Sequence, residues 1–229
     1  MKRRHIRRQI TGLLVIVLSA VAVWAAQLSQ PTLTPLSPEL QQHYFGSSTA
    51  MEELGKLAVK GRAPKTGYSR KQFGDGWGEV NDCSVREVVL ARDLTDEKTD
   101  EKCRVQSGVL ADPYTGKTIH FQRGAKTSQL VQIDHVVALS DAWQKGAQQL
   151  TAEQRVQLAN DPLNLLAVDG PANQAKSDAD AATWLPPHKP FHCQYVARQV
   201  AVKRKYQLWV TEAEKEAMTR ILLSCGDSR

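Results

Sequence analysis

The stretch that decides the fold is QLVQIDHVVALSDAW at residues 129–143, followed after a helical interval by NDPLNLLAVDGPANQAKSDAD at residues 160–180. Residues 130–137 and 163–168 are short apolar runs rich in β-branched side chains, which predicts two strands. A helix should follow over residues 171–182, because it would begin with a proline, whose missing N–H is not needed in the first turn. The stretch therefore predicts the order strand, connection, strand, helix.

The polar residues of this stretch are spaced so that several of them can act at one site. Asp134 and His135 are adjacent on a strand, so their side chains diverge, and Asn173 and Lys176 share a helix face. Carboxylate and amide oxygens suit a Mg²⁺ ion that keeps several waters. A neutral His135 can take a proton from an attacking water while a backbone carbonyl or the Asn164 region holds its other ring nitrogen. This pattern favours a one-metal phosphodiester hydrolase.

Three segments carry a resemblance to a known family: IDHVVALSDAW, PLNLLAVD and NQAKSD. They resemble the HNH family of the His-Me finger nucleases, in particular a secreted bacterial branch similar to the C-terminal nuclease domain of GmrSD-type modification-dependent restriction enzymes. The similarity extends from FGDGW at residues 73–77 to the C-terminus. It implies an α+β fold with a ββα-metal core, an N-terminal β-hairpin and flanking helices, stabilised by disulfides.

The resemblance also implies a role for each motif residue. Asp134 and Asn173 resemble the metal ligands, His135 the general base, Asn164 the residue that orients the base loop, and Lys176 a phosphate contact. The third motif position is Asn173, where many family members have His, which fits a hard metal but leaves its identity open. Mg²⁺ is favoured, with Mn²⁺ and Ca²⁺ as alternatives, and no small-molecule cofactor is expected.

Basic residues outside the motif are candidates for contacts with a nucleic-acid backbone. Arg123 and Lys126 immediately precede the catalytic strand, and Arg86 lies on an expected helix over residues 83–94. Such contacts position the substrate without reading its sequence. The alternative for Arg86 is an ordinary surface ion pair. DNA is the expected substrate, and RNA is an open alternative. The sequence does not indicate an oligomeric state.

The formal charge of +6 over 229 residues is a poor guide to nucleic-acid binding. Residues 1–26 contain five of the 30 basic side chains and none of the 24 acidic ones, so the remainder is almost neutral. The five basic residues precede an apolar run over residues 10–26, which is typical of a secretory signal. An uncleaved membrane anchor is the alternative. Either way, the rest of the chain is expected outside the cytoplasm, secreted or at the cell surface.

Four widely spaced cysteines agree with that compartment. They lack the close pairs of a zinc site. Of the three possible connectivities we favour two local bridges, which join Cys83 to Cys103 and Cys193 to Cys225.

The domain organisation follows from composition. Residues 27–65 begin with a polar, Pro-rich segment and read as a tether. The nuclease domain is expected over residues 66–229, with Phe73 and Trp77 packed on its core and a β-hairpin within residues 104–123. Two other functions stay open: a non-catalytic nucleic-acid-binding or uptake module on the same fold, and a disulfide-stabilised interaction domain.

Overall fold

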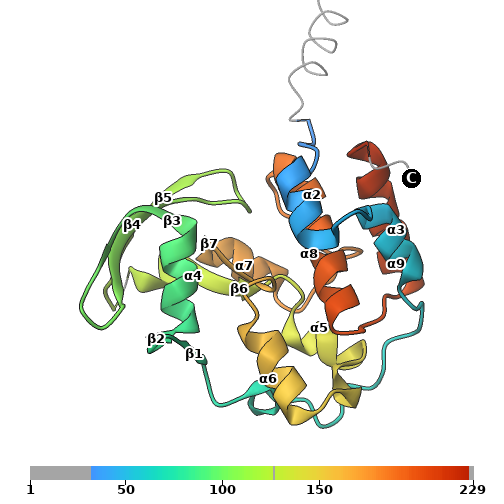
Figure 1. The fold of residues 1–229 in the computed structure, drawn as a ribbon, viewed down its shortest axis with the longest axis horizontal. Coiled ribbons are helices and arrows are strands. Elements are labelled where there is room, and N and C mark those ends of the chain that lie inside the picture. Colours follow the sequence, from blue (N-terminus) through green and yellow to red (C-terminus); the bar gives the residue numbers. More distant parts are fainter. Residues whose placement is uncertain (1–31, 126, 227–229) are drawn as a thin grey trace, which may run out of the picture. The chain divides into compact units, whose positions relative to one another are not determined.

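A computed structural model describes residues 32–125 and 127–226. Strand β6 (Val131–His135) pairs antiparallel with strand β7 (Leu165–Asp169), and helix α7 (Gly170–Lys176) follows β7 directly (Figure 1). The Asp169 side chain accepts a hydrogen bond from Ala172 N and caps the helix. The predicted order of strand, connection, strand and helix is therefore present.

Two local features limit helix α7. A Cβ atom at Gly170 would collide with the Gln129 carbonyl oxygen, so only glycine fits at the first position. The helix ends at Lys176 because Ser177 has a left-handed backbone, with φ of 52°. The helix predicted over residues 171–182 is thus too long.

A separate three-stranded sheet contains the predicted hairpin. Its order is β3 (Leu94–Thr99), β4 (Val105–Ala111) and β5 (Thr118–Gln122), all antiparallel. The turn between β4 and β5 is fixed by Asp112, whose Oδ2 accepts from Thr115 N at 2.7 Å. Asp112 Oδ1 accepts from Asp169 N at 2.9 Å, which attaches this turn to the end of β7.

Helix α4 (Val85–Asp93) packs beside β7 and the three-stranded sheet. A small ladder precedes it, formed by β1 (Glu79–Val80) and β2 (Cys83–Ser84). The Cys83–Cys103 disulfide joins this ladder to the loop between β3 and β4. A second disulfide, Cys193–Cys225, joins helix α8 (His192–Lys205) to the end of α9 (Glu212–Ser224). Both expected pairings are confirmed, and the mixed α+β fold is as predicted.

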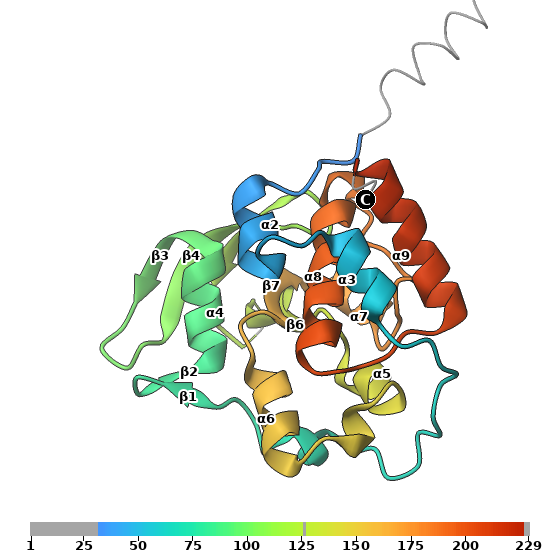
Figure 2. The same ribbon diagram turned by 45° about the vertical axis from the view of Figure 1, so that its right-hand side comes forward.

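The region expected to be a tether is partly folded into the domain. Helices α2 (Pro38–Phe45) and α3 (Ala50–Lys56) lie beside α8, and α3 also contacts α9 (Figures 1 and 2). Their apolar side chains, including Phe45 and Leu54, are buried in the same core as the α8 residues. The compact unit begins at Leu33, so the boundary predicted at residue 66 is too late. Burial of these side chains favours packing over an extended tether.

The connection between β6 and β7 contains helix α5 (Leu139–Gln144), a 3₁₀ turn at Ala147–Gln149 and helix α6 (Ala152–Asn160). Thr151 and Gln154 form the expected capping box of α6. A further 3₁₀ turn, η1 (Arg70–Phe73), packs on α5 and α6, and Phe73 is buried there with Trp143. This arrangement places residues 70–77 next to the end of β6.

A buried cluster of charges joins the helices on this side. Lys145 is fully buried, and its Nζ lies 2.8 Å from Asp141, 2.7 Å from Asp180 and 2.6 Å from Glu214. Arg62, whose side chain is 34% exposed, contacts Asp141 and Asp180 from the N-terminal segment. Buried carboxylates need such partners because burial of an isolated charge is very costly.

In the described part of the chain, no helix combines the length and apolar character needed to cross a membrane. The predicted signal or anchor at residues 1–26 lies outside the described residues.

Candidate active site

His135 ends strand β6 with only 7% of its surface exposed. Its Nε2 lies 2.9 Å from the Ala159 carbonyl oxygen at the end of α6. A carbonyl only accepts hydrogen bonds, so Nε2 carries the ring proton and Nδ1 has a free lone pair. The Trp77 ring is stacked on the imidazole, with centroids 5.7 Å apart and an interplanar angle of 9°. The imidazole is thus held in one tautomer and in one plane.

Burial lowers the pKa of His135 to about 4. The positive charges of Arg70 and Lys176 lower this pKa further, while the hydrogen bond to Ala159 opposes the shift. The imidazole is therefore neutral at neutral pH and is able to accept a proton at Nδ1.

Asn164 is fully buried and holds the backbone around His135. Its Oδ1 accepts from Val137 N at 2.8 Å, and its Nδ2 donates to the carbonyls of Val137 and Leu158 at 3.3 Å each. Leu158 directly precedes Ala159, whose carbonyl binds His135. Asn164 consequently connects the loop after β6 to the end of α6 and does not touch the imidazole itself.

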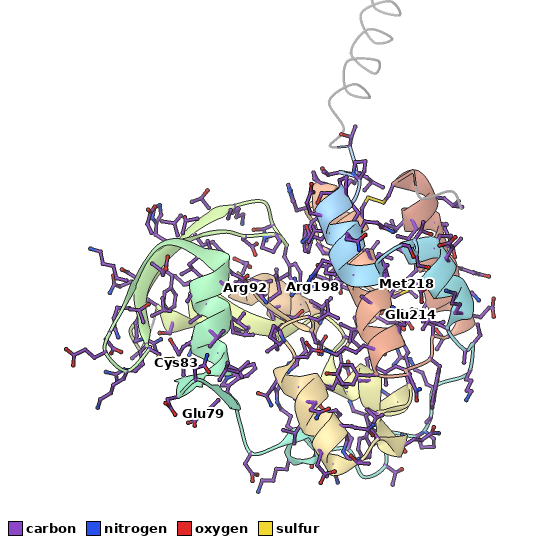
Figure 3. All side chains as sticks on the ribbon, in the orientation of Figure 1. Glu79, Cys83, Arg92, Arg198, Glu214 and Met218 are labelled. Atoms are coloured by element: carbon purple, nitrogen blue, oxygen red, sulfur yellow. A yellow bond between two sulfur atoms is a disulfide. The ribbon has the colours of Figure 1, made fainter. Side chains whose placement is uncertain are left out.

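Two arginines donate hydrogen bonds to the backbone of the segment that contains Asn164. Arg92 of α4 and Arg198 of α8 (Figure 3) both donate to the Pro162 and Leu165 carbonyl oxygens at 2.7–2.9 Å. These hydrogen bonds come from rigid helices, so they fix where β7 begins. No local pattern in the sequence predicts this arrangement.

Asp134 lies in a buried hydrogen-bonded cluster. Its Oδ2 accepts from the Tyr114 hydroxyl at 2.5 Å, and its Oδ1 lies 2.9 Å from Lys176 Nζ. Burial raises the pKa of the Asp134 carboxyl above its ordinary value, although Lys176 and Tyr114 oppose this. Burial and the adjacent carboxylate also raise the pKa of Tyr114 well above 10, so its hydroxyl remains a donor.

Lys176 does not lie where a phosphate contact was expected. Its side chain is fully buried, and Nζ also donates to the His135 carbonyl oxygen at 2.8 Å. A solvated phosphate cannot reach this ammonium without displacing Asp134. The spacing in the sequence predicts the helix face of Lys176 but not the burial of its side chain.

Asn173 is half-buried and lies on the same face of α7 as Lys176. Its Nδ2 donates to Gln132 Oε1 at 2.9 Å, and no hydrogen bond to its Oδ1 occurs within residues 32–125 and 127–226. Asn173, Asp134 and His135 line one cavity of about 340 Å³, together with Arg70 and Asp178. The structure therefore brings three of the predicted site residues together.

The oxygen donors of this cavity fit a hard divalent ion that retains water. In the described residues, no three His, Cys, Asp or Glu side chains are grouped as a metal site. One carboxylate from Asp134 and one amide oxygen from Asn173 supply few protein ligands. A hard divalent ion held by so few protein ligands completes its shell with water and substrate phosphate.

The predicted backbone-contact residues lie elsewhere. Arg86 and Arg123 both pair with Glu87, at 2.7 and 2.5 Å, and neither lines the cavity. Arg123 Nε also donates to the Val105 carbonyl, so Arg123 connects α4 to the three-stranded sheet, whereas the Arg86 pair lies within α4. Lys126 lies outside the described residues.

Two residues at the site were not identified as functional from the sequence. Arg70 is exposed, lines the cavity of Asp134 and His135, and makes no ion pair with any residue in the described part of the chain. Trp77, expected to be a core residue, does pack partly on the core but also stacks on His135. The only signal was the run of basic and aromatic residues in RKQFGDGW at residues 70–77.

Residues 84–221 match the family described as GmrSD restriction endonucleases, C-terminal domain. The chain belongs to this family. The GmrSD C-terminal domains are HNH-type nuclease domains, so the resemblance inferred from the motifs is confirmed. An uncharacterized secreted protein of Arthroderma benhamiae is 39% identical over 211 residues, which cover 91% of this chain and 97% of that protein. No solved structure matches the chain.

Proposed function

We propose that this GmrSD_C-family protein is an exported, metal-dependent endonuclease that hydrolyses phosphodiester bonds of DNA, with RNA as a second substrate class. One observation carries the proposal: His135, whose Nε2 is held by the Ala159 carbonyl oxygen, lines one cavity together with Asp134 and Asn173. We assign β6, β7 and α7 as the ββα-metal core of a His-Me finger.

Asp134 and Asn173 would hold the divalent ion, and Mg²⁺ is the metal that their oxygens favour. When bound, such an ion stabilises negative charge on the phosphate and on the leaving oxygen in the transition state. Tyr114 and Lys176 orient the Asp134 carboxylate by hydrogen bonds to its two oxygens. Both hydrogen bonds restrain the orientation of the carboxylate, and Asp134 lines the cavity that Asn173 also lines.

His135 acts as the general base. Its Nδ1 accepts a proton from a water molecule as the water oxygen attacks phosphorus, and the bond from phosphorus to the 3′ oxygen breaks. The products are a 5′-phosphate and a 3′-hydroxyl, which takes a proton from solvent. The low pKa of His135 keeps it unprotonated before each turnover.

Arg70 replaces Lys176 as the expected phosphate contact. Its guanidinium is on the rim of the cavity, whereas the Lys176 ammonium is used to compensate Asp134. A guanidinium suits this role because it binds phosphate oxygens through two parallel N–H donors.

Export is supported by two independent features. The two disulfides persist best in an oxidising compartment, and the similar Arthroderma protein is described as secreted. Residues 1–26 would direct export as a cleaved signal, or would remain as a membrane anchor. The sequence features of this segment support both roles.

A plasmid-relaxation assay tests the proposed activity directly. The disulfide-bonded protein is incubated with supercoiled DNA in Mg²⁺, Mn²⁺ or EDTA, beside a His135→Ala variant. We expect nicking that requires metal and is lost in the variant. A folded protein that binds DNA tightly at low salt but never cuts it would instead be a binding or uptake module on this fold.

A further inference from the structure

A second cavity lies on the other side of His135. It has a volume of about 320 Å³ and shares His135, Arg70 and Leu139 with the cavity of Asp134 and Asn173. The imidazole therefore forms part of the wall of both cavities. A substrate whose phosphate reaches Nδ1 must place an adjoining group in or near this second space.

The lining of the second cavity is largely apolar and aromatic. Phe73, Leu139 and Ala159 contribute apolar surface, and Trp77 adds an aromatic ring. Arg70 and Lys71 contribute positive charge, and Asp75 adds a hydrogen-bond acceptor. Aromatic surface beside cations is the combination that binds single nucleotides, since the base contacts the apolar surface and the phosphates contact the cations.

We propose that this second cavity is a nucleoside subsite, which receives the unstacked nucleoside next to the scissile phosphate. This inference rests on the proposed nuclease function. The volume falls within the usual range of small-ligand pockets, roughly 300–1,000 Å³. Asp75 accepts a hydrogen bond from a base amino group, and the Lys71 stem adds apolar surface below its ammonium.

The subsite has a consequence for the class of substrate. A base inside a duplex is paired and stacked, so entry into the cavity requires its removal from the stack, which costs a few kcal/mol. A single strand or a locally unpaired site largely avoids this cost. The protein is therefore a nuclease that prefers unpaired nucleic acid over regular duplex.

Much of this cavity is lined by residues 70–77. These residues precede the region that matches the family, residues 84–221. The subsite thus depends on a segment outside the matched region. Residues 70–73 are held in place by Arg155, which donates from Nε to the Gln72 carbonyl at 2.9 Å.

The test uses synthetic strands cleaved by the wild-type protein with Mg²⁺ or Mn²⁺. The cleaved bond is first mapped on a single-stranded oligonucleotide, and the base on either side of that bond is then removed. We expect removal of one of these bases to lower kcat/KM at least about fivefold, the lower end of the effect of stacking one base. The matched duplex should be cut at least about fivefold more slowly than the single strand.

A variant assigns the effect to this cavity. Lys71→Ala and Lys71→Met both remove the ammonium, but only Lys71→Ala removes the apolar stem. Lys71→Ala should therefore have a lower kcat/KM than Lys71→Met on the intact strand, and the two variants should have equal kcat/KM on the strand that lacks the base. Lys98→Ala, an exposed lysine of β3, is the control and should change neither reaction.

Cleavage that is indifferent to both adjoining bases, or equal on single strand and duplex, would overturn the subsite while leaving the nuclease intact. An equal difference between Lys71→Ala and Lys71→Met on both strands would also overturn it. Failure to cut any strand with any metal would overturn the proposed function, and the subsite with it.

Discussion

The Lys176 ammonium lies 2.9 Å from Asp134 Oδ1 and 2.8 Å from the His135 carbonyl oxygen, with its side chain fully buried. One buried cation therefore holds the proposed metal ligand and the backbone of the proposed base. Removal of a single partner from a buried ion pair leaves an uncompensated charge. The residue that the motif suggested as a phosphate contact is thus an internal support of the site.

The first prediction concerns this support. Lys176→Met keeps most of the volume and removes the charge, so we expect the free energy of unfolding without metal to fall by about 3–5 kcal/mol. Urea denaturation measures this loss. A second change, Asp134→Asn, should recover part of the loss because the unpaired carboxylate is then gone. If Lys176→Met leaves stability unchanged and raises only KM, the phosphate-contact role expected from the motif is correct.

The second prediction concerns Trp77, which we regard as a positioning residue for His135. Trp77→Ala removes the stacked ring and lets water reach the imidazole, so the pKa of His135 should rise from about 4 toward its ordinary value. The base acts when unprotonated, so the acidic limb of kcat at saturating metal should move to higher pH. Trp77→Phe should restore most of the wild-type profile. An unchanged limb in a folded Trp77→Ala protein contradicts this role.

The third prediction concerns Arg70. Arg70→Ala should lower kcat/KM roughly 10- to 100-fold, because a donor to the phosphate is lost. The slope of log K for DNA binding against log salt should decrease in magnitude by about 1. Thermal stability should stay close to wild type, since the side chain is exposed. Lys98→Ala provides the control for loss of a surface charge, and equal effects of the two variants would count against a specific contact.

The fourth prediction concerns acid stability. Burial alone would raise the pKa of Asp180, but its hydrogen bond to Lys145 and the charges of Lys145 and Arg62 lower this pKa to about 2. A lowered folded-state pKa stabilises the fold above the unfolded-state pKa of about 4, and this contribution disappears as pH falls through about 2. Asp180→Asn should therefore lower stability at pH 7, by about 1–2 kcal/mol because solvent partly reaches the cluster through Arg62. Denaturation of both proteins between pH 7 and pH 2 should show this difference shrinking below pH 4, and a constant difference would contradict the assignment.

The sequence was most informative where structure is local. The apolar runs before Asp134 and around Leu166 predicted both strands, Pro171 predicted the start of α7, and Thr151 with Gln154 predicted the capping box. Motif order then identified His135, Asn164 and Asn173 as neighbours in space, and the structure places them around one strand end.

Contacts between distant segments could not be predicted in this way. Nothing local indicates that Tyr114, in a hairpin turn, reaches Asp134, or that Trp77 stacks on His135. The helical spacing predicts which face of the helix Lys176 lies on. It does not predict that the Lys176 side chain is buried, because burial depends on neighbours from other elements. The Pro-rich composition of residues 27–65 favours a tether, and nothing local indicates that α8 and α9 supply the surface that buries Leu54 of α3.

Each of the two disulfides joins one cysteine inside the region that matches the family to one cysteine just outside it. Cys103 and Cys193 lie inside residues 84–221, while their partners Cys83 and Cys225 lie just outside, one at each end. Each bridge therefore links a flanking segment to the matched region, and the segment of β6, β7 and α7 contains no cysteine. Reduction of both bridges would therefore release the two flanks of the matched region without breaking any covalent link within β6, β7 or α7.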